Sequence, residues 1–251
     1  MTTATTPSPT QHVPDLSGQT VVVIGGSAGI GLETARAARA EGADVVLTGR
    51  NPERLERAAA DVGARSTAAF DAVDMPRLEL FFADLPKPID HVLVTAGGPY
   101  YAPVPEFDFD KARSTLDAHL FLPIRIAQLA PGTMRPSGTL LFVGGTGGRR
   151  PTAGAFASAA TAALPALVAG LAVELAPIRV NLIAPGFVDT PLSASLLGHQ
   201  LDARRDELRA TLPIARVVGP DDVGRLAIHL MTNTALTGAT YDIDGGQQLV
   251  A

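Results

Sequence analysis

The residues with the clearest chemical potential form one run, Gly25-Gly26-Ser27-Ala28-Gly29-Ile30-Gly31. The run follows an apolar stretch at 20–24 and precedes a helical pattern that continues to residue 39. Glycines let a backbone turn sharply and approach a ligand, and a helix N-terminus offers free N–H groups to a phosphate. A tight strand-to-helix turn without a ligand uses glycine in the same way. The position between a buried strand and a helix favours a dinucleotide site.

The composition leaves few other groups for catalysis. The chain has no cysteine, which excludes disulfides, thiolate metal ligands and a cysteine nucleophile, and we expect no metal site. Its basic residues are almost all arginine, and the only lysines are Lys87 and Lys111. The only tyrosines are Tyr100, Tyr101 and Tyr241. A proton-transfer site must therefore be assembled from a small set of side chains.

Length and charge narrow the class of protein. The chain has 251 residues, of which 46% are hydrophobic and 18% charged, which suits one α/β domain with a sizeable core. The net charge of −5 argues against nucleic acid as a partner. Residues 1–14 lack the basic start and apolar core of a signal peptide, so we expect a flexible tail and a cytoplasmic protein. The uncharged stretch 151–173 is rich in alanine and glycine, and we expect a buried or subunit-packed helix there and no membrane span.

Short apolar runs alternate with helical patterns along the chain. Strands are expected at 20–24, 44–48, 67–70, 89–95, 139–143, 179–183 and 240–243. Helices are expected from the glycine run through 39, and at 52–61, 75–82, 109–129, 154–175, 193–212 and 221–231. Such alternation predicts parallel βαβ units with right-handed crossovers. The expected fold class is therefore α/β, a single Rossmann-like domain over residues 15–251 with a doubly wound parallel sheet of about seven strands and helices on both faces.

The spacing G-x-x-x-G-I-G resembles the glycine motif of the short-chain dehydrogenase/reductase family, with Ile24 in place of the usual threonine. Further segments resemble motifs of this family in the same order: Asp71-Ala72-Val73-Asp74, Val94-Thr95-Ala96-Gly97, Ile178-Arg179-Val180-Asn181, Pro185-Gly186 with Thr190, 219–223 and 236–246. The resemblance covers roughly residues 16 to 249. It implies a substrate lid at about 189–212 and a homodimer or homotetramer formed through the helices at 109–129 and 154–175.

The resemblance also implies which residues bind a nicotinamide cofactor. They are Gly25, Ser27, Ala28, Gly29, Ile30, Arg50, Asn51, Asp71, Ala72, Ala96, Gly97, Pro185, Gly186, Val188 and Thr190. The second strand ends without an acid that would bind a ribose 2′-hydroxyl. Arg50 can pair with a 2′-phosphate instead, so NADP(H) is expected in preference to NAD(H). The alternative is that Arg50 is only a surface residue beside the Asn51 helix cap.

The groups that move protons in this family are missing. Family members reduce carbonyls with a tyrosine, a lysine four residues later, a serine and an asparagine, because hydride arriving at carbon needs a proton at oxygen. Here Gly145 stands at the serine position, and Ala157 and Thr161 stand at the tyrosine and lysine positions. A register shifted by one residue would place Phe156 and Ala160 there instead. Since a positioned acid contributes about 10²–10⁴-fold, we expect ordinary ketone turnover to be absent or strongly impaired.

Three side chains are candidate catalytic replacements, namely His119, Tyr100 and Thr146. His119 stands at the asparagine position of a long helix and offers an imidazole, or it is an ordinary helix histidine. Tyr100 follows the fourth strand, where its phenol could enter the pocket or its ring could form an aromatic lid. Thr146 offers a hydroxyl among glycines whose N–H groups could also bind an anion. Arg149 and Arg150 come next, where they could attract an acidic substrate or remain solvated.

These observations predict an NADP(H)-dependent oxidoreductase with a non-standard proton donor. Its substrate is expected to be a small organic carbonyl, imine or activated alkene. Two other functions use the same features. One is a catalytically inactive NADP(H)-binding sensor or scaffold, and the other is a non-redox lyase or isomerase that reuses the fold.

Overall fold

The computed structural model describes residues 15–149 and 154–250. The expected flexible tail at 1–14 lies outside the described residues, as does Arg150. The expected helix at 154–175 falls within them.

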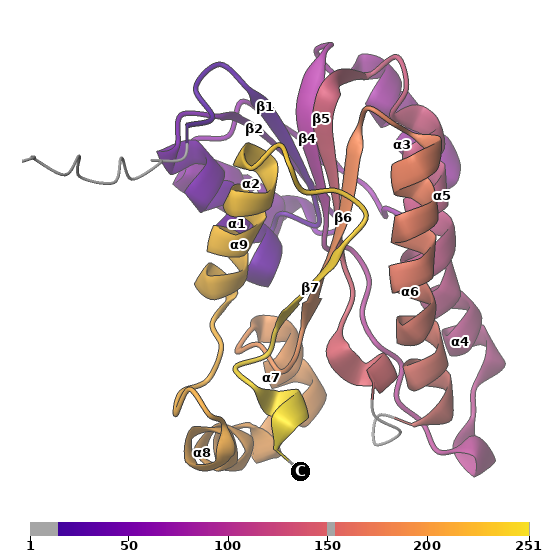
Figure 1. Ribbon diagram of the computed structural model, residues 1–251, viewed down its shortest axis with the longest axis vertical. Helices are drawn as coiled ribbons and strands as arrows, with labels where there is room; N and C mark the ends of the chain where they lie inside the picture. Colours follow the sequence, from indigo (N-terminus) through magenta and orange to yellow (C-terminus); the bar gives the residue numbers. More distant parts are fainter. Residues whose placement is uncertain (1–14, 150–153, 251) are drawn as a thin grey trace, which may run out of the picture.

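One parallel sheet runs through the molecule in the order β3-β2-β1-β4-β5-β6-β7, which confirms the expected fold class (Figure 1). Its strands are β1 (Thr20–Ile24), β2 (Asp44–Gly49), β3 (Ser66–Ala69), β4 (Ile89–Val94), β5 (Met134–Val143), β6 (Arg179–Pro185) and β7 (Thr240–Ile243). The chain moves outward from β1 to β3 and then returns to place β4 beside β1. This reversal leaves a crevice beyond the carboxyl ends of these two strands, where ligands of open α/β sheets bind.

Helices cover both faces of the sheet (Figure 1). One face carries α1 (Gly29–Ala40), α2 (Pro52–Val62) and α9 (Pro220–Thr232). The other carries α3 (Met75–Asp84), α4 (Phe109–Leu116), α5 (Leu122–Leu129) and α6 (Ala155–Glu174). Successive strand residues point to opposite faces, so Val21 and Val23 join one buried cluster while Val22 and Ile24 join the other. The continuous apolar run of β1 is explained by burial on both sides.

Two expected helices are divided in the structure. The expected helix at 109–129 contains a π-turn, Asp117–Phe121, between α4 and α5. Pro123 has no N–H for the carbonyl of residue 119 and its ring would clash with that carbonyl, which explains the wider turn. The expected helix at 193–212 is divided into α7 (Pro191–Leu197) and α8 (Leu201–Thr211), because Gly198 takes a positive φ of 51°.

Helix α6 has one buried and one uncovered side. Leu164 and Val168 are buried and face the sheet, whereas Val173 is 79% exposed. By length and composition α6 is the one helix of the described residues that could cross a membrane, and 33% of its most apolar window is buried. Its contacts with β6 and with the 3-10 turn η3 (Thr146–Arg149) make it an integral part of this domain.

A buried polar pair lies near the amino ends of the strands. The Arg179 guanidinium, in a residue that is 7% exposed, donates hydrogen bonds to the backbone carbonyls of Leu230 and Met231, both at 2.7 Å. His91 is 3% exposed, and its Nε2 lies 2.8 Å from Oε1 of Gln19. Burial, and secondarily the charge of Arg179, lowers the pKa of His91 from 6.5 to about 3. The folded protein therefore holds this imidazole neutral.

His91 makes the stability of the protein depend on pH. Between pH 6.5 and about 3 the unfolded chain takes up a proton that the folded chain excludes. The free energy of unfolding is expected to fall as the pH drops below 6.5, by up to about 1.4 kcal/mol per pH unit from this residue alone. Urea unfolding at several pH values checks this. The contribution should vanish in His91→Gln and persist in the exposed-site control His199→Gln; an unchanged pH slope in His91→Gln would contradict it.

Candidate functional site

The glycine-rich turn after β1 is packed tightly against the end of β4. Gly25 has a φ of 96°, and a Cβ on it would lie 2.7 Å from Oγ1 of Thr95. The same Thr95 hydroxyl donates a hydrogen bond of 3.0 Å to the Gly25 carbonyl. A Cβ on Gly31 would overlap that carbonyl oxygen. Side chains are therefore excluded at both glycines, and the turn is held by a threonine that sequence reasoning did not single out.

The start of α1 is suited to an anion. The N-cap residue Ala28 provides no side-chain hydrogen bond, and the first turn of the helix contains no acidic residue. The first N–H groups of the helix and its positive dipole end are thus left for a ligand. Gly29 takes a φ of 54°, and a Cβ on it would lie 3.4 Å from Cβ of Thr190. The turn fits the pyrophosphate of a dinucleotide, and the segment after β6 lies beside it.

The other predicted cofactor residues gather at the same edge of the sheet. Ile30 lies in the first turn of α1, and Ala96 and Gly97 follow β4. Arg50 and Asn51 follow β2, Asp71 and Ala72 follow β3, and Pro185, Gly186 and Val188 lie at the end of β6 and beyond. Ser27 is 8% exposed, and its Oγ would lie 3.0 Å from a Cβ built on Gly49. Asn51 caps α2 by accepting a hydrogen bond of 2.8 Å from the N–H of Arg54, while the Arg50 side chain is exposed beside it.

The structure favours one of the two registers considered for the missing tyrosine and lysine. A Cβ on Gly145 would lie 3.5 Å from the Pro185 carbonyl oxygen and 3.9 Å from Cγ2 of Thr161. Thr161 therefore faces Gly145, the residue expected at the serine position. Its hydroxyl donates to the Ala157 carbonyl at 2.7 Å and is used within α6. Ala157 is 7% exposed, so the tyrosine position holds a buried methyl group.

His119 lies at the nicotinamide end of this edge, on the π-turn. A Cβ on Gly97 would lie 3.5 Å from Cε1 of His119, and the π-turn packs against α6. His119 Nδ1 lies 2.9 Å from the Thr115 carbonyl oxygen. A carbonyl can only accept, so Nδ1 carries the proton and Nε2 of the neutral ring is left as an acceptor. Among the described residues Nε2 has no hydrogen-bond partner, so His119 remains a candidate for proton transfer, as does Thr146.

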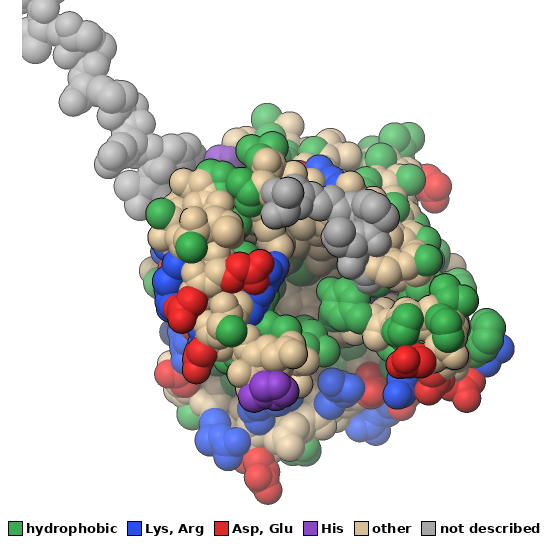
Figure 2. Space-filling model, turned by 90° about the horizontal axis from the view of Figure 1, so that it is seen from below, with side chains coloured by type: hydrophobic (Ala, Val, Ile, Leu, Met, Phe, Trp, Pro, Cys, Tyr) green, Lys and Arg blue, Asp and Glu red, His purple; other side chains and the backbone are tan. Residues whose placement is uncertain are grey.

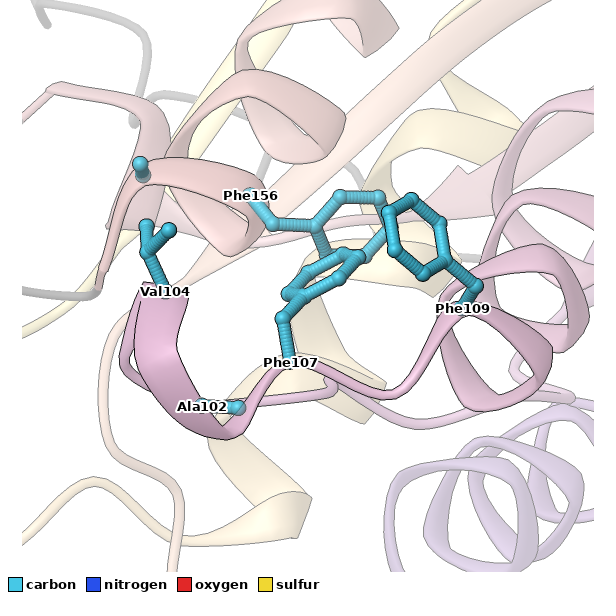
Figure 3. A pocket seen from close by; sticks show the side chains of 6 residues that line it. Ala102, Val104, Phe107, Phe109 and Phe156 are labelled. Carbon is cyan, nitrogen blue, oxygen red and sulfur yellow. The ribbon is translucent and has the colours of Figure 1, made fainter.

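Tyr100 is occupied within its own loop. Its phenol oxygen accepts a hydrogen bond of 2.7 Å from the N–H of Asp108, and its ring packs against Phe107 and Phe156. These contacts hold Tyr100 within its own loop, while its O–H still carries a proton that it can donate. The Phe107 and Phe156 rings, 5.3 Å apart, also line a cavity of about 310 Å³ whose walls are apolar (Figure 3). Ala102, Val104, Phe109 and Ala155 complete that lining.

The segment after β5, which contains η3, contacts the carboxyl-terminal part of the chain. Thr146 begins the η3 turn, and Arg149 ends it. The Arg149 guanidinium forms an ion pair of 2.5 Å with Asp242, which also accepts a hydrogen bond of 3.1 Å from the Gln248 amide. Of the two possibilities for Arg149, simple solvation is excluded by this pair, and an acidic substrate would have to compete with Asp242 for the guanidinium. Arg150 lies outside the described residues.

Viewed from the carboxyl edge of the sheet, the molecular surface is hollowed at its centre, and apolar side chains form part of the wall (Figure 2). Among the described residues no group of three or more His, Asp or Glu side chains could hold a metal ion. The arrangement can therefore bind a dinucleotide by backbone N–H groups and offers one imidazole for proton transfer.

The fold agrees with comparisons to known proteins. A family model described as enoyl-(acyl carrier protein) reductase matches residues 25–248. The chain is 30% identical to the short-chain dehydrogenase/reductase ATR9 of Stachybotrys chlorohalonatus, over 93% of this chain and 98% of that protein. The structure of the MalC reductase/Diels-Alderase of Malbranchea aurantiaca is similar with a TM-score of 0.86 and 26% identity, covering 93% and 98% of the two chains. A short chain dehydrogenase of Burkholderia cenocepacia in complex with NADP has a TM-score of 0.83 and 28% identity, covering 93% and 99%.

Glycine substitutions after β5 test this geometry. A Cβ on Gly148 would lie 2.5 Å from the backbone N of Ala162, whereas one on Gly145 meets nothing closer than 3.5 Å. Gly148→Ala is expected to lower the free energy of unfolding by about 1–3 kcal/mol through overpacking. Gly145→Ala should leave it almost unchanged. Equal effects of the two variants in urea unfolding would contradict the placement of η3 against α6.

Proposed function

The chain belongs to the short-chain dehydrogenase/reductase family, and on that premise we propose that it is an NADP(H)-dependent oxidoreductase with a non-standard proton donor. The proposal rests on a difference between two parts of the site, the residues for the cofactor and the residues for proton transfer. The backbone cradle for the dinucleotide is complete, from Gly25 to Thr190. The positions that supply protons in this family hold Gly145, Ala157 and Thr161. Cofactor binding is kept while the usual acid is gone.

The residues of this chain bind and orient the cofactor. The free N–H groups at the start of α1 bind the pyrophosphate, and Thr190 and Val188 flank the nicotinamide end. The exposed Arg50 pairs with the 2′-phosphate, and an acid side chain at position 49 would crowd Ser27, whose Oγ lies 3.0 Å from a Cβ built on Gly49. The bound cofactor supplies a hydride at the nicotinamide ring. The similarity to a solved structure in complex with NADP supports this assignment.

The substrate we propose is one whose reduction needs no strong acid. An activated alkene accepts hydride at one carbon and a proton at its neighbour, and an imine accepts the proton at nitrogen. His119 is the proposed proton donor: its Nδ1–H donates to the Thr115 carbonyl, and its Nε2, an acceptor in the neutral ring, takes up a proton from water and passes it to the substrate. The apolar cavity beside Phe107 and Phe156 favours a substrate with an apolar ring or chain. The similarity to a protein named reductase/Diels-Alderase supports the reductase part of this proposal.

We further propose that the chain forms a homodimer or homotetramer through α4, α5 and α6. Phe121 at the end of the π-turn is 55% exposed and Ile124 of α5 is 37% exposed. Val173 of α6 is 79% exposed. Removing such apolar surface from water favours association by about 25 cal/mol per Å². A second copy of the chain, with the same apolar faces, is the proposed occupant.

Arg50 provides the test of cofactor preference. Arg50→Ala is expected to raise the NADPH dissociation constant about 10- to 100-fold, because a charge-assisted contact to the phosphate is lost, and to change NADH binding little. Fluorescence titration of bound cofactor measures both constants. Arg54→Ala, an exposed arginine in the first turn of α2, is the matched control and should bind NADPH like the unaltered protein. Equal NADPH affinity in the Arg50 variant would refute the proposed phosphate contact.

His119 provides the test of the proton donor. His119→Gln is expected to lower the rate of NADPH oxidation by about 10²-fold on an imine or enone substrate, and to leave NADPH affinity unchanged. The amide keeps a polar side chain on the π-turn but cannot give up a proton. Full activity in this variant would remove His119 from the mechanism and leave water as the donor.

The association proposal is tested by a charge on α6. Light scattering coupled to size-exclusion chromatography is expected to show a dimer or tetramer for the unaltered chain. Val173→Glu should shift the mass toward monomer, whereas Leu80→Glu on α3, where the leucine is 61% exposed, should not. A monomer for the unaltered chain would overturn this proposal.

A further inference from the structure

A charged pair joins α8 to the segment after β6. Arg205 of α8 donates to Asp189 from two nitrogens, with Nε 2.9 Å from Oδ2 and Nη2 2.7 Å from Oδ1. The planar guanidinium matches the carboxylate in a bidentate pair, which is stronger and more directional than a single contact. The third nitrogen, Nη1, donates to Asp202 one helical turn earlier at 2.9 Å. The pair is part-buried, with side-chain exposures of 28% and 32%.

Asp189 sits in the segment that the proposed function places at the nicotinamide. It lies between Val188 and Thr190, and its backbone N–H donates to the Val218 carbonyl at 3.0 Å. Val188 forms a parallel bridge with Val218, which ties the start of the lid to the chain beyond its end. The hydroxyl of Ser193 donates to the Val188 carbonyl at 2.8 Å. These contacts hold the backbone of Val188 and Asp189 from one side, and the Asp189 carboxylate contacts α8 on the other.

Helix α8 has little else to hold it. Leu208 is the one residue of α8 that is buried. The ion pairs Arg204–Glu207 and Arg209–Asp206 both stay within the helix. Of the ion pairs that α8 makes with described residues, the one between Arg205 and Asp189 reaches the segment after β6. The pair therefore couples the position of α8 to that of residues 188–190, because an interaction acts on both of its partners.

We infer that Arg205 is a positioning residue, which holds Val188 and Thr190 in place for the nicotinamide end of the cofactor by gripping Asp189. The inference rests on the proposed binding of NADP(H). Two contacts would be disturbed if the pair were broken. Thr190 lies beside the glycine-rich turn, 3.4 Å from a Cβ built on Gly29. Leu192 lies beside the segment after β4, and its Cδ1 would be 3.7 Å from a Cβ built on Gly98.

The test combines cofactor binding with hydrogen exchange. Arg205→Gln is expected to raise the NADPH dissociation constant about three- to tenfold, the effect of losing one part-exposed bidentate pair. Asp189→Asn should do the same, and the double variant should be no worse than either single one, because both remove one interaction. Arg209→Gln, an exposed arginine of the same helix, is the matched control and should bind NADPH normally.

Hydrogen exchange without cofactor gives a readout that does not depend on NADPH. Arg205→Gln should speed amide exchange at 188–190 while the midpoint of thermal unfolding stays near that of the unaltered protein. If the unaltered protein does not bind NADPH, the proposed function fails. If it binds NADPH and Arg205→Gln binds equally well with unchanged exchange at 188–190, the inference about Arg205 fails alone.

Discussion

No side chain fits between the glycine-rich turn after β1 and the end of β4, and the whole carboxyl edge of the sheet depends on this close approach. The turn can come so near only because Gly25 and Gly31 lack a Cβ and because the Thr95 hydroxyl binds the Gly25 carbonyl. This brings the start of α1 beside Thr190 and thus beside the segment after β6. Backbone groups from three strands then surround one crevice, and the cradle for a dinucleotide follows from packing as much as from polar side chains.

The site has two parts, one that binds the cofactor and one where protons would be transferred. Backbone N–H groups and glycines form the binding half, and these do not depend on which side chains perform proton transfer. In the other half the positions of the family's serine, tyrosine and lysine hold small or unreactive residues, and Thr161 uses its hydroxyl within α6. The imidazole of His119 stands at the boundary, because the π-turn caused by Pro123 directs its helix segment toward Gly97.

The fold was predictable because its signals are local. The β-branched runs of β1, β2 and β6 and the cap at Asn51 are read within a few residues. The cap at Thr190 and the contact between Thr161 and Gly145 needed the structure. Contacts between residues that lie far apart in the sequence cannot be predicted from a single sequence. The ion pairs Arg149–Asp242 and Arg205–Asp189 are examples. The π-turn did have a local signal in Pro123, but its effect was not anticipated.

The central claim is that this chain transfers hydride from NADPH without a tyrosine–lysine pair. Mass spectrometry of the product, after incubation with NADPH deuterated on one face of the nicotinamide ring, tests it most directly. The account predicts that one labelled face transfers deuterium to carbon of an imine or activated alkene, and that the ordinary ketone of matched size reacts far more slowly or not at all. Tight NADPH binding with no deuterium in any product of a wide panel would contradict the claim and leave a cofactor-binding protein without redox activity.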